Sequence, residues 1–360
     1  MIVKPGDYVP SLRWRTGEYQ ALFRLNDSAK RRIVPFIVIP EIEFDFEEWK
    51  DKKTVQEHVE PFPKRYKDKW GARPAWIDVH PKILAVPMDD GRLPVQYVFD
   101  ELAKKPGSKA VPVTSLDAPT GVNAAVAAIV RRDGRGVGIR ARIEHIMKPG
   151  FATALANLLK LVGVEPREAD LVLDLGAPNY EPYDDFADAL IAALAGVDTA
   201  AFRNFILMGC AYPETVALDK PGGDLKRHDW LFYKAFVAKL EDDDRIPNFS
   251  DYTIVNPEFT PRDMRMIKSG GKVVYTMPET WFIRKGGAFR DNPAQMHDHC
   301  DHIVKSGKFR GAGFSSGDEY IAQCATKAKK PSSQSWWKFV AINHHVMHVL
   351  DDLAKLGAAA

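Results

Sequence analysis

Short apolar, β-branched runs alternate with longer amphipathic stretches along the first 256 residues. The amphipathic stretches predict helices near residues 18–25, 95–104, 122–130, 151–162, 186–194 and 230–240, and a long polar stretch follows the second apolar run. The apolar runs predict eight strands, at Tyr8–Trp14, Val34–Pro40, Ala75–Val79, Ala110–Leu116, Val137–Ile143, Asp170–Leu175, Asn204–Met208 and Tyr252–Val255.

These strands are nearly continuous in apolar residues, which is typical of parallel strands covered on both faces. Eight strand–helix units of this kind predict an α/β fold, a TIM-like (β/α)₈ barrel over residues 1–256. A doubly wound open sheet is the alternative. It normally carries a glycine-rich turn after its first strand, where this chain has Arg15–Thr16–Gly17–Glu18.

The alternation stops after residue 256. Residues 272–284 predict a pair of strands bent at Met277–Pro278, and residues 292–305 and 335–356 predict helices. We therefore expect an α+β appendage over residues 257–357 that packs on the barrel. The alanines at 358–360 resemble a cloning remnant.

Composition narrows the class of protein. The net charge is only +2 with 27% charged residues, so the chain has no clear nucleic-acid footprint. The N-terminus lacks the apolar segment of a signal peptide, and no apolar run reaches the roughly 18 residues that span a membrane. Three cysteines without a CxxC pair do not predict a disulfide framework. We expect a cytoplasmic protein without membrane association.

Barrel enzymes place their active sites at the carboxyl ends of the strands. Among the charged residues there, Asp78, Arg140 and Asp174 lie within or at the end of apolar strands, so we take them as catalytic candidates. For the others, capping of the following helix is the alternative. A mixture of carboxylates and arginines suits an anionic substrate or a divalent metal, whose ligands stay undetermined. The remaining charged residues at strand ends are Arg13, Arg15, Glu41, His80, Asp117, Glu144, Glu214 and Asp251.

Six of the ten histidines lie between His297 and His348, which raises the question of a metal site. His299 and His302 share a face if their segment is helical, and so do His344 and His348. No familiar zinc spacing is completed elsewhere in the chain, and polar or core positions on helices are the alternative.

Several stretches together resemble the phage-type beta protein family of bacteria, prophages and phage satellites. They are YVPSLRWRTGEYQAL at 8–22, FSDYTIVNP at 249–257, TWFIRKG at 280–286, FSSGDEYI at 314–321, and Trp337 with Asn343–His344–His345. The resemblance implies a role in phage–host conflict or beside a toxin-like neighbour. The positions that match the family pattern are Arg13, Gly17, Glu18, Asp251, Tyr252, Trp281, Arg284, Gly317, Asp318, Trp337, His344 and His345.

We take Asp251, Asp318 and His344 from this set as further catalytic candidates. The candidates for binding a substrate or partner are Arg13, Glu18, Tyr252, Trp281, Arg284, Trp337 and His345. We expect six of these residues to meet in space near the edge of the eighth strand: Asp251, Tyr252, Trp281, Arg284, Asp318 and His344. Asp251 or Asp318 should lie within hydrogen-bonding reach of Arg284 or of one of the two histidines. The same set acting only to fix the appendage to the barrel is the alternative.

Two functions stay open at this point. The first is a scaffold that binds a protein partner in a defence or toxin-control system. The second is a barrel enzyme that acts on a small anionic ligand, phosphate-containing or nucleotide-like, with or without a divalent metal. A deep pocket where Arg13, Asp78, Arg140 and Asp174 converge favours the enzyme, whereas a plugged mouth with charges paired among themselves favours the scaffold.

Overall fold

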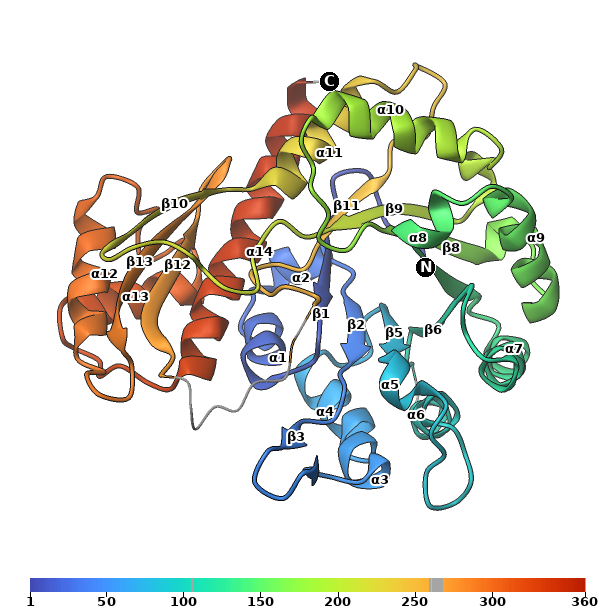
Figure 1. Ribbon diagram of the computed structural model, residues 1–360, viewed down its shortest axis with the longest axis horizontal. Helices are drawn as coiled ribbons and strands as arrows, with labels where there is room; N and C mark the ends of the chain where they lie inside the picture. Colours follow the sequence, from blue (N-terminus) through green and yellow to red (C-terminus); the bar gives the residue numbers. More distant parts are fainter. Residues whose placement is uncertain (105–106, 259, 261–267, 360) are drawn as a thin grey trace.

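A computed structural model describes residues 1–104, 107–258, 260 and 268–359. Eight parallel strands close into a barrel, in which the last strand pairs with the first, Val9 lying opposite Ser250 (Figure 1). In order around the barrel, the strands are β1 (Val9–Leu12), β2 (Phe36–Ile39), β5 (Ala75–Val79), β6 (Ala110–Ser115), β7 (Val137–Arg142), β8 (Ala169–Asp174), β9 (Asn204–Gly209) and β11 (Asn248–Asp251). The predicted (β/α)₈ fold class is confirmed.

Helices cover the outside of this barrel and bury their apolar faces against it. In α9, for example, Phe151, Leu155, Leu158 and Val162 form one buried face at helical spacing. The helices of the barrel region are α1 (Thr16–Phe23), α2 (Asp27–Arg31), α3 (Val55–Val59), α4 (Phe62–Lys69), α5 (Pro81–Leu84), α6 (Pro94–Ala103), α7 (Thr120–Asp133), α8 (Ile143–Ile146), α9 (Phe151–Val162), α10 (Tyr183–Leu194) and α11 (His228–Ala238).

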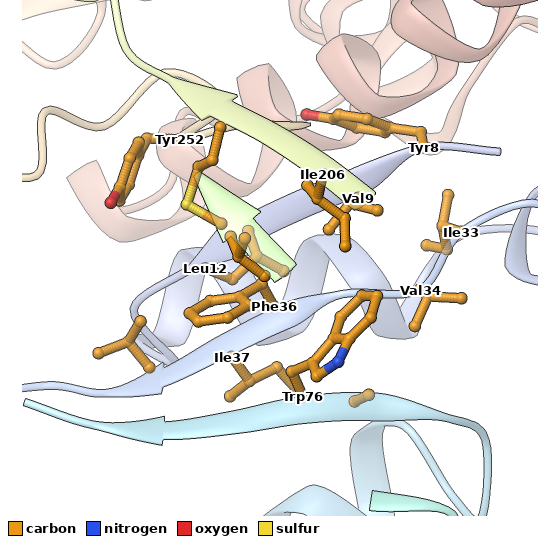
Figure 2. Packing of buried hydrophobic residues seen from close by; sticks show 14 of the residues in the cluster. Tyr8, Val9, Leu12, Ile33, Val34, Phe36, Ile37, Trp76, Ile206 and Tyr252 are labelled. Atoms are coloured by element: carbon orange, nitrogen blue, oxygen red, sulfur yellow. The ribbon is translucent and has the colours of Figure 1, made fainter. Parts of the chain in front are cut away.

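The barrel interior is filled with side chains. Trp76 on β5 reaches across it, because its indole nitrogen donates a hydrogen bond of 2.7 Å to Asp170 on β8, three strands away. Gly138 on β7 makes room for this ring, since a Cβ at that position would lie 2.8 Å from Cδ1 of Trp76. Phe36 on β2 packs beside the indole, with ring centroids 6.4 Å apart (Figure 2).

Successive side chains of a strand point to opposite faces, so residues two positions apart point to the same side. Residue 78 follows Trp76 by two positions, and residue 140 follows Gly138 by two. Asp78 and Arg140 therefore point into the barrel one layer above the indole, at the carboxyl ends of the strands.

The eighth strand was predicted in the wrong place. It is β11, Asn248–Asp251, whereas Tyr252–Val255 forms the turn after it. The run Asn248–Phe249–Ser250–Asp251 carries three polar residues, which hides it from a search for apolar strands. Ser250 and Asp251 are nevertheless fully buried.

The appendage contains a three-stranded antiparallel sheet, and the predicted strand pair forms two of its strands, β12 (Gly270–Thr276) and β13 (Thr280–Ala288). The third strand, β10 (Gly222–Lys226), comes from the connection between β9 and α11 and pairs with β13, Asp224 opposite Phe282. Residues 259 and 261–267 of the expected appendage, and Ala360 of the alanine tail, lie outside the described residues.

Three helices complete the described part of the appendage: α12 (Gln295–Lys305), α13 (Ser316–Ala325) and α14 (Gln334–Ala359). The last of them, drawn in red, runs between the three-stranded sheet and the barrel (Figure 1). Among the described residues, no helix has the length and apolar character to cross a bilayer.

Close contacts fix α14 to its neighbours. A Cβ on Gly17 of α1 would lie 2.7 Å from Cβ of Lys338, and one on Gly317 of α13 would lie 2.3 Å from the carbonyl oxygen of Val340. Asn343 joins both neighbours, because its amide accepts from the backbone N–H of Gly317 (3.0 Å) and donates to the carbonyl of Ala21 (3.0 Å). The two glycines of the family pattern are thus places where helices approach closely.

Candidate functional site

Arg140 is the centre of a charged network at the barrel mouth. Its guanidinium donates to Asp174 (2.8 Å), to Asp78 (2.7 Å) and to the hydroxyl of Tyr252 (2.9 Å). Tyr252 in turn donates to Asp174 (2.8 Å). The four side chains come from β5, β7, β8 and the turn after β11, so the closure of the barrel itself brings them together.

This network is charged and nearly dry. Arg140 and Asp78 each expose 11% of their side chains, and Asp174 exposes 3%. Burial raises the pKa of Asp78, against the opposing effect of Arg140. Burial also disfavours the charge on Arg140, but Tyr252 and the two carboxylates outweigh it and raise the pKa of the guanidinium. The guanidinium therefore stays charged, and each of its three nitrogen atoms donates to a side chain of the protein.

A second charged group lies beside it at the ends of β1 and β2. The carboxylate of Glu41 accepts from Arg13 (2.6 Å) and Arg15 (3.1 Å), and His80 lies 3.7 Å away. Burial works to raise the pKa of Glu41, but the two guanidinium groups lower it. Burial lowers the pKa of His80 to about 4, so this imidazole is neutral. The predicted mouth residues do converge, but as ion pairs with one another.

A cavity of about 210 Å³ opens beside these charges, at the carboxyl ends of β8 and β9. Its wall includes Tyr180, Cys210, Tyr212 and His228. Behind the wall, the carboxylate of Asp229 accepts hydrogen bonds from the backbone N–H groups of Ala211 (3.0 Å) and Trp230 (2.8 Å). Burial, with the nearby Asp251, raises the pKa of Asp229 to about 7.

Asp251 belongs to a separate cluster, completely buried between the barrel and the appendage. One of its carboxylate oxygens lies 2.9 Å from Nε2 of His345, and the other accepts from the hydroxyl of Tyr8. The Nδ1 of His345 lies 3.0 Å from the hydroxyl of Thr276 on β12. These three interactions join the first strand, the last barrel strand, the appendage sheet and α14.

His344 has its own carboxylate. Its Nδ1 lies 2.9 Å from Asp318 of α13, and its Nε2 lies 2.9 Å from the carbonyl oxygen of Thr276. Tyr275 donates to the same carboxylate (2.7 Å), and its ring stacks on the imidazole. Both ring nitrogens of His344 therefore face oxygen atoms of the protein. The predicted reach between a carboxylate and a histidine is confirmed twice.

The other half of that prediction is wrong, since no single meeting place holds Asp251, Tyr252, Trp281, Arg284, Asp318 and His344. Tyr252 turns to the mouth, Trp281 packs against Tyr212 (5.3 Å between ring centroids), and Trp337 packs against Tyr320 (5.3 Å). Arg284 lies on β13 near His299, away from both carboxylates. Glu18 accepts from the backbone N–H of Arg15 and so caps α1. The tryptophans are buried because large apolar surfaces separate from water, and they settle at different packing sites.

The histidine string of α12 does not converge on one point. Nδ1 of His297 lies 2.7 Å from the carbonyl oxygen of Cys324, and a Cβ on Gly286 of β13 would lie 2.8 Å from Nε2 of His299. The ring of His302 lies beside Phe282. Within the part of the chain that the structure describes, no three His, Cys, Asp or Glu side chains group as metal ligands.

Sequence reasoning missed several members of the buried clusters, Asp229, Tyr8, Thr276, Arg227 and Asp352 among them. Arg227 donates to Asp352 of α14 (2.8 Å) and to the carbonyl of Met277 (2.9 Å), and its side chain is fully buried. In the sequence, Asp229 looks like an ordinary first-turn charge of a helix. The one available signal was its position between His228 and Trp230, directly before an aromatic-rich run.

A closed ring of eight parallel strands, with paired charges at its mouth and a helical appendage locked to it, defines a (β/α)₈ barrel protein with a C-terminal extension. The sequence pattern of the family described as Beta protein matches residues 8–351, nearly the whole chain. The chain belongs to the Beta protein family. A comparison with curated proteins found no match.

Proposed function

We propose that this protein is a scaffold that binds a protein partner in a phage-conflict or mobile-element system, and that the partner docks on the hairpin after β2. The hairpin consists of β3 (Phe44–Asp45) and β4 (Lys50–Asp51) and projects from the barrel (Figure 1). Trp49 in this hairpin exposes 77% of its surface. That exposure is the observation on which the proposal rests, because exposed tryptophans are frequent anchors of protein interfaces.

The hairpin is built to present this side chain. Trp49 adopts a positive φ of 49°, an uncommon conformation for a residue with a side chain, and its ring lies edge-on to Phe44 at 6.1 Å. At the base, Glu43 accepts from Arg15 at 2.7 Å, which ties the hairpin to the start of α1. An aromatic side chain on an anchored support loses less conformational freedom on binding than one on a loose loop.

The charges at the mouth support the same proposal. Arg140 is paired with Asp78 and Asp174, and Arg13 with Glu41, so binding a free anion there first requires breaking these pairs. Removing the partner of a buried charge is costly. The pairing therefore favours a structural role for the network over recognition of a phosphate group.

The test is capture of partners from phage-challenged host cells by the full chain, followed by titration calorimetry with the purified partner. Trp49→Ala should weaken binding by at least about tenfold, a loss typical of an interface anchor. Leu161→Ala is the matched control, since Leu161 is also more than half exposed but lies on α9. Equal affinity of Trp49→Ala and the wild type would contradict the proposal.

A barrel enzyme acting on a small phosphate-containing or nucleotide-like substrate is the second candidate, and the cavity at β8 and β9 favours it. Barrel active sites lie on this face, and His228 in the cavity wall carries a side chain that suits acid–base chemistry. His228→Gln should then abolish turnover in a screen of nucleotides and sugar phosphates while the protein stays folded. Turnover that survives this substitution would exclude His228 as the acid–base group.

A further inference from the structure

A small pocket of about 80 Å³ lies where α13 and α14 meet the C-terminal end of α1. Arg24, which follows α1, and Lys329, which follows α13, line this pocket. Its wall also contains the aromatic residues Tyr320, Trp336 and Phe339. Because α1 belongs to the barrel region and the two other helices to the appendage, the pocket lies on the boundary between them (Figure 1).

Both cations of the pocket are held over its aromatic rings. Cζ of Arg24 lies 4.9 Å from the ring centroid of Trp336 and 5.3 Å from that of Phe339. Nζ of Lys329 lies 5.4 Å from the ring centroid of Tyr320. A contact with a ring needs none of the N–H donors of a guanidinium, so Arg24 keeps them for another acceptor.

Neither cation has a carboxylate partner. Among the described residues, Arg24 and Lys329 form no ion pair with Asp or Glu. The carboxylate of Glu319 in the pocket wall accepts a hydrogen bond from Gln323 (3.1 Å) instead. Several other arginines that lie over aromatic rings do have carboxylate partners: Arg73, Arg92, Arg140, Arg227 and Arg310.

The positive charge continues from this pocket to α4, which α1 also contacts. Phe23, directly before Arg24, exposes 44% of its surface, and Nζ of Lys69 on α4 lies 4.5 Å from its ring centroid. Cζ of Arg65, one turn before Lys69, lies 5.5 Å from the ring centroid of Tyr19. Within the described ranges, Arg65 and Lys69 also form no ion pair with a carboxylate. These four residues form the cationic surface: Arg24, Arg65, Lys69 and Lys329.

We propose that the cationic surface docks an acidic peptide segment of a protein partner, with one carboxylate of that segment paired with Arg24 in the pocket. A guanidinium matches a carboxylate because two of its N–H groups bind the two oxygens together. The rings hold Arg24 and Lys329 before the peptide arrives, so less conformational freedom is lost on binding. The cationic surface does not include the hairpin after β2, so this inference goes beyond the proposed function.

The same surface is poorly suited to nucleic acid, the other common polyanion. Proteins that bind single strands offer open aromatic faces on which bases stack. Here Tyr320 and Phe339 are buried, and Lys69 lies over the exposed ring of Phe23. The net charge of the chain is only +2, which is low for a protein that binds nucleic acid. The arrangement therefore favours the carboxylates of a peptide.

The experiment measures the fluorescence anisotropy of labelled hexaglutamate titrated with the purified full chain. We expect saturable binding that weakens as salt rises, because salt screens exposed charges. Arg24→Gln should weaken binding about tenfold, the effect of losing a hydrogen bond between charged groups. Lys329→Gln should weaken it about threefold, the effect of one exposed ion pair. Arg131→Gln is the matched control and should bind like the wild type, because Arg131 is exposed on α7, outside the cationic surface.

A photo-cross-linking derivative of the peptide locates the binding site. It should label the end of α1 or residues of α13, and labels confined to other elements would overturn the proposal. So would the absence of hexaglutamate binding, equal affinity of Arg24→Gln and the wild type, or tighter binding of an oligothymidylate of equal charge. Melting curves check that the variants stay folded, and Lys329→Gln with the cross-linking map decides if Arg24→Gln does not. The probe is the peptide alone, so these outcomes do not depend on the partner expected at the hairpin.

Discussion

The Nε2 of His345, on the last helix, lies 2.9 Å from a carboxylate oxygen of Asp251, on the last strand of the barrel. Tyr8, directly before the first strand, donates to the other oxygen of the same carboxylate. A single buried carboxylate therefore joins both ends of the barrel sheet to the C-terminal helix. Three features that are far apart in the sequence depend on it, which makes it a sensitive point for stability.

Substitution of His345 by alanine should destabilise the protein strongly. It leaves the fully buried Asp251 without its imidazole partner, and the loss of one partner of a buried pair costs about 3–5 kcal/mol. Chemical denaturation measures the change in unfolding free energy. His302→Ala is the control, because His302 is exposed and its loss should change stability by less than about 0.5 kcal/mol. Equal stability of both variants would show that Asp251 has another source of stabilisation.

The imidazole of His345 should be neutral at neutral pH, with its proton on Nε2. Burial lowers its pKa, Nε2 faces the carboxylate of Asp251, and Nδ1 lies 3.0 Å from the hydroxyl of Thr276, which then donates to it. Nitrogen-15 NMR of the His345 ring at neutral pH identifies its charge state and tautomer. A protonated Nδ1 in His345 would contradict the assignment.

Removal of Asp174 should disrupt the mouth network. Asp174→Ala leaves the guanidinium of Arg140 and the hydroxyl of Tyr252 short of an acceptor, and we expect a loss of about 3–5 kcal/mol in unfolding free energy. Asp117→Ala is the comparison, because Asp117 is 46% exposed and its pair with Arg142 spans 3.7 Å. Exposed pairs contribute only about 0–1 kcal/mol. Equal melting temperatures of Asp174→Ala and Asp117→Ala would show that Asp174 does not stabilise the mouth network.

Glycine is needed inside the barrel at position 138. Gly138→Ala forces a methyl group to within 2.8 Å of the Trp76 ring, and overpacking of this kind costs about 1–3 kcal/mol. Gly121→Ala, in α7, meets no atom within 4 Å and should be neutral or slightly stabilising, since alanine favours helices. Thermal unfolding of the pair tests the packing of the barrel interior. Tolerance of Gly138→Ala would mean that Trp76 can move.

Asp229 should give the protein a pH-dependent stability. Its pKa is raised from 3.8 to about 7, so between these values the folded state holds a proton that the unfolded state releases. Stability from this group is therefore full below about pH 4 and declines as pH rises to about 7, by at most ~1.4 kcal/mol per pH unit. The unfolding free energy, measured by denaturation at several pH values in this range, should depend less on pH in Asp229→Asn than in the wild type. An unchanged slope would show that Asp229 is ionised throughout.

The sequence predicts most of the barrel because seven of its strands are apolar and covered on both faces. The eighth strand is not predicted, since Ser250 and Asp251 look like loop residues until their partners are known. His345, the partner of Asp251, lies 94 residues later in the chain. The strand β10 is not predicted for a similar reason. It contains two glycines, an aspartate and a lysine, and it is a strand because β13 pairs with it.

The candidate site was also predictable from the sequence only in part. Asp78, Arg140 and Asp174 were recognisable because charged residues in apolar strands must find partners. The partners of these three residues depend on how the barrel closes. The amino-acid composition does not show which charges pair with each other. Arg284 and Trp337 match the family pattern as Asp318 does, but only the structure separates residues of the buried cluster from those that pack elsewhere.

The origin of β10 has a consequence for synthesis of the chain. This strand leaves the ribosome as part of the barrel, yet its partner β13 follows only after the last barrel strand has been made. Asp251 likewise waits for His345, which lies 94 residues later in the chain. Until β13 and α14 have been made, the nascent barrel carries an unpaired strand and Asp251 lacks its imidazole partner, so the final locking of the barrel follows the synthesis of these two elements.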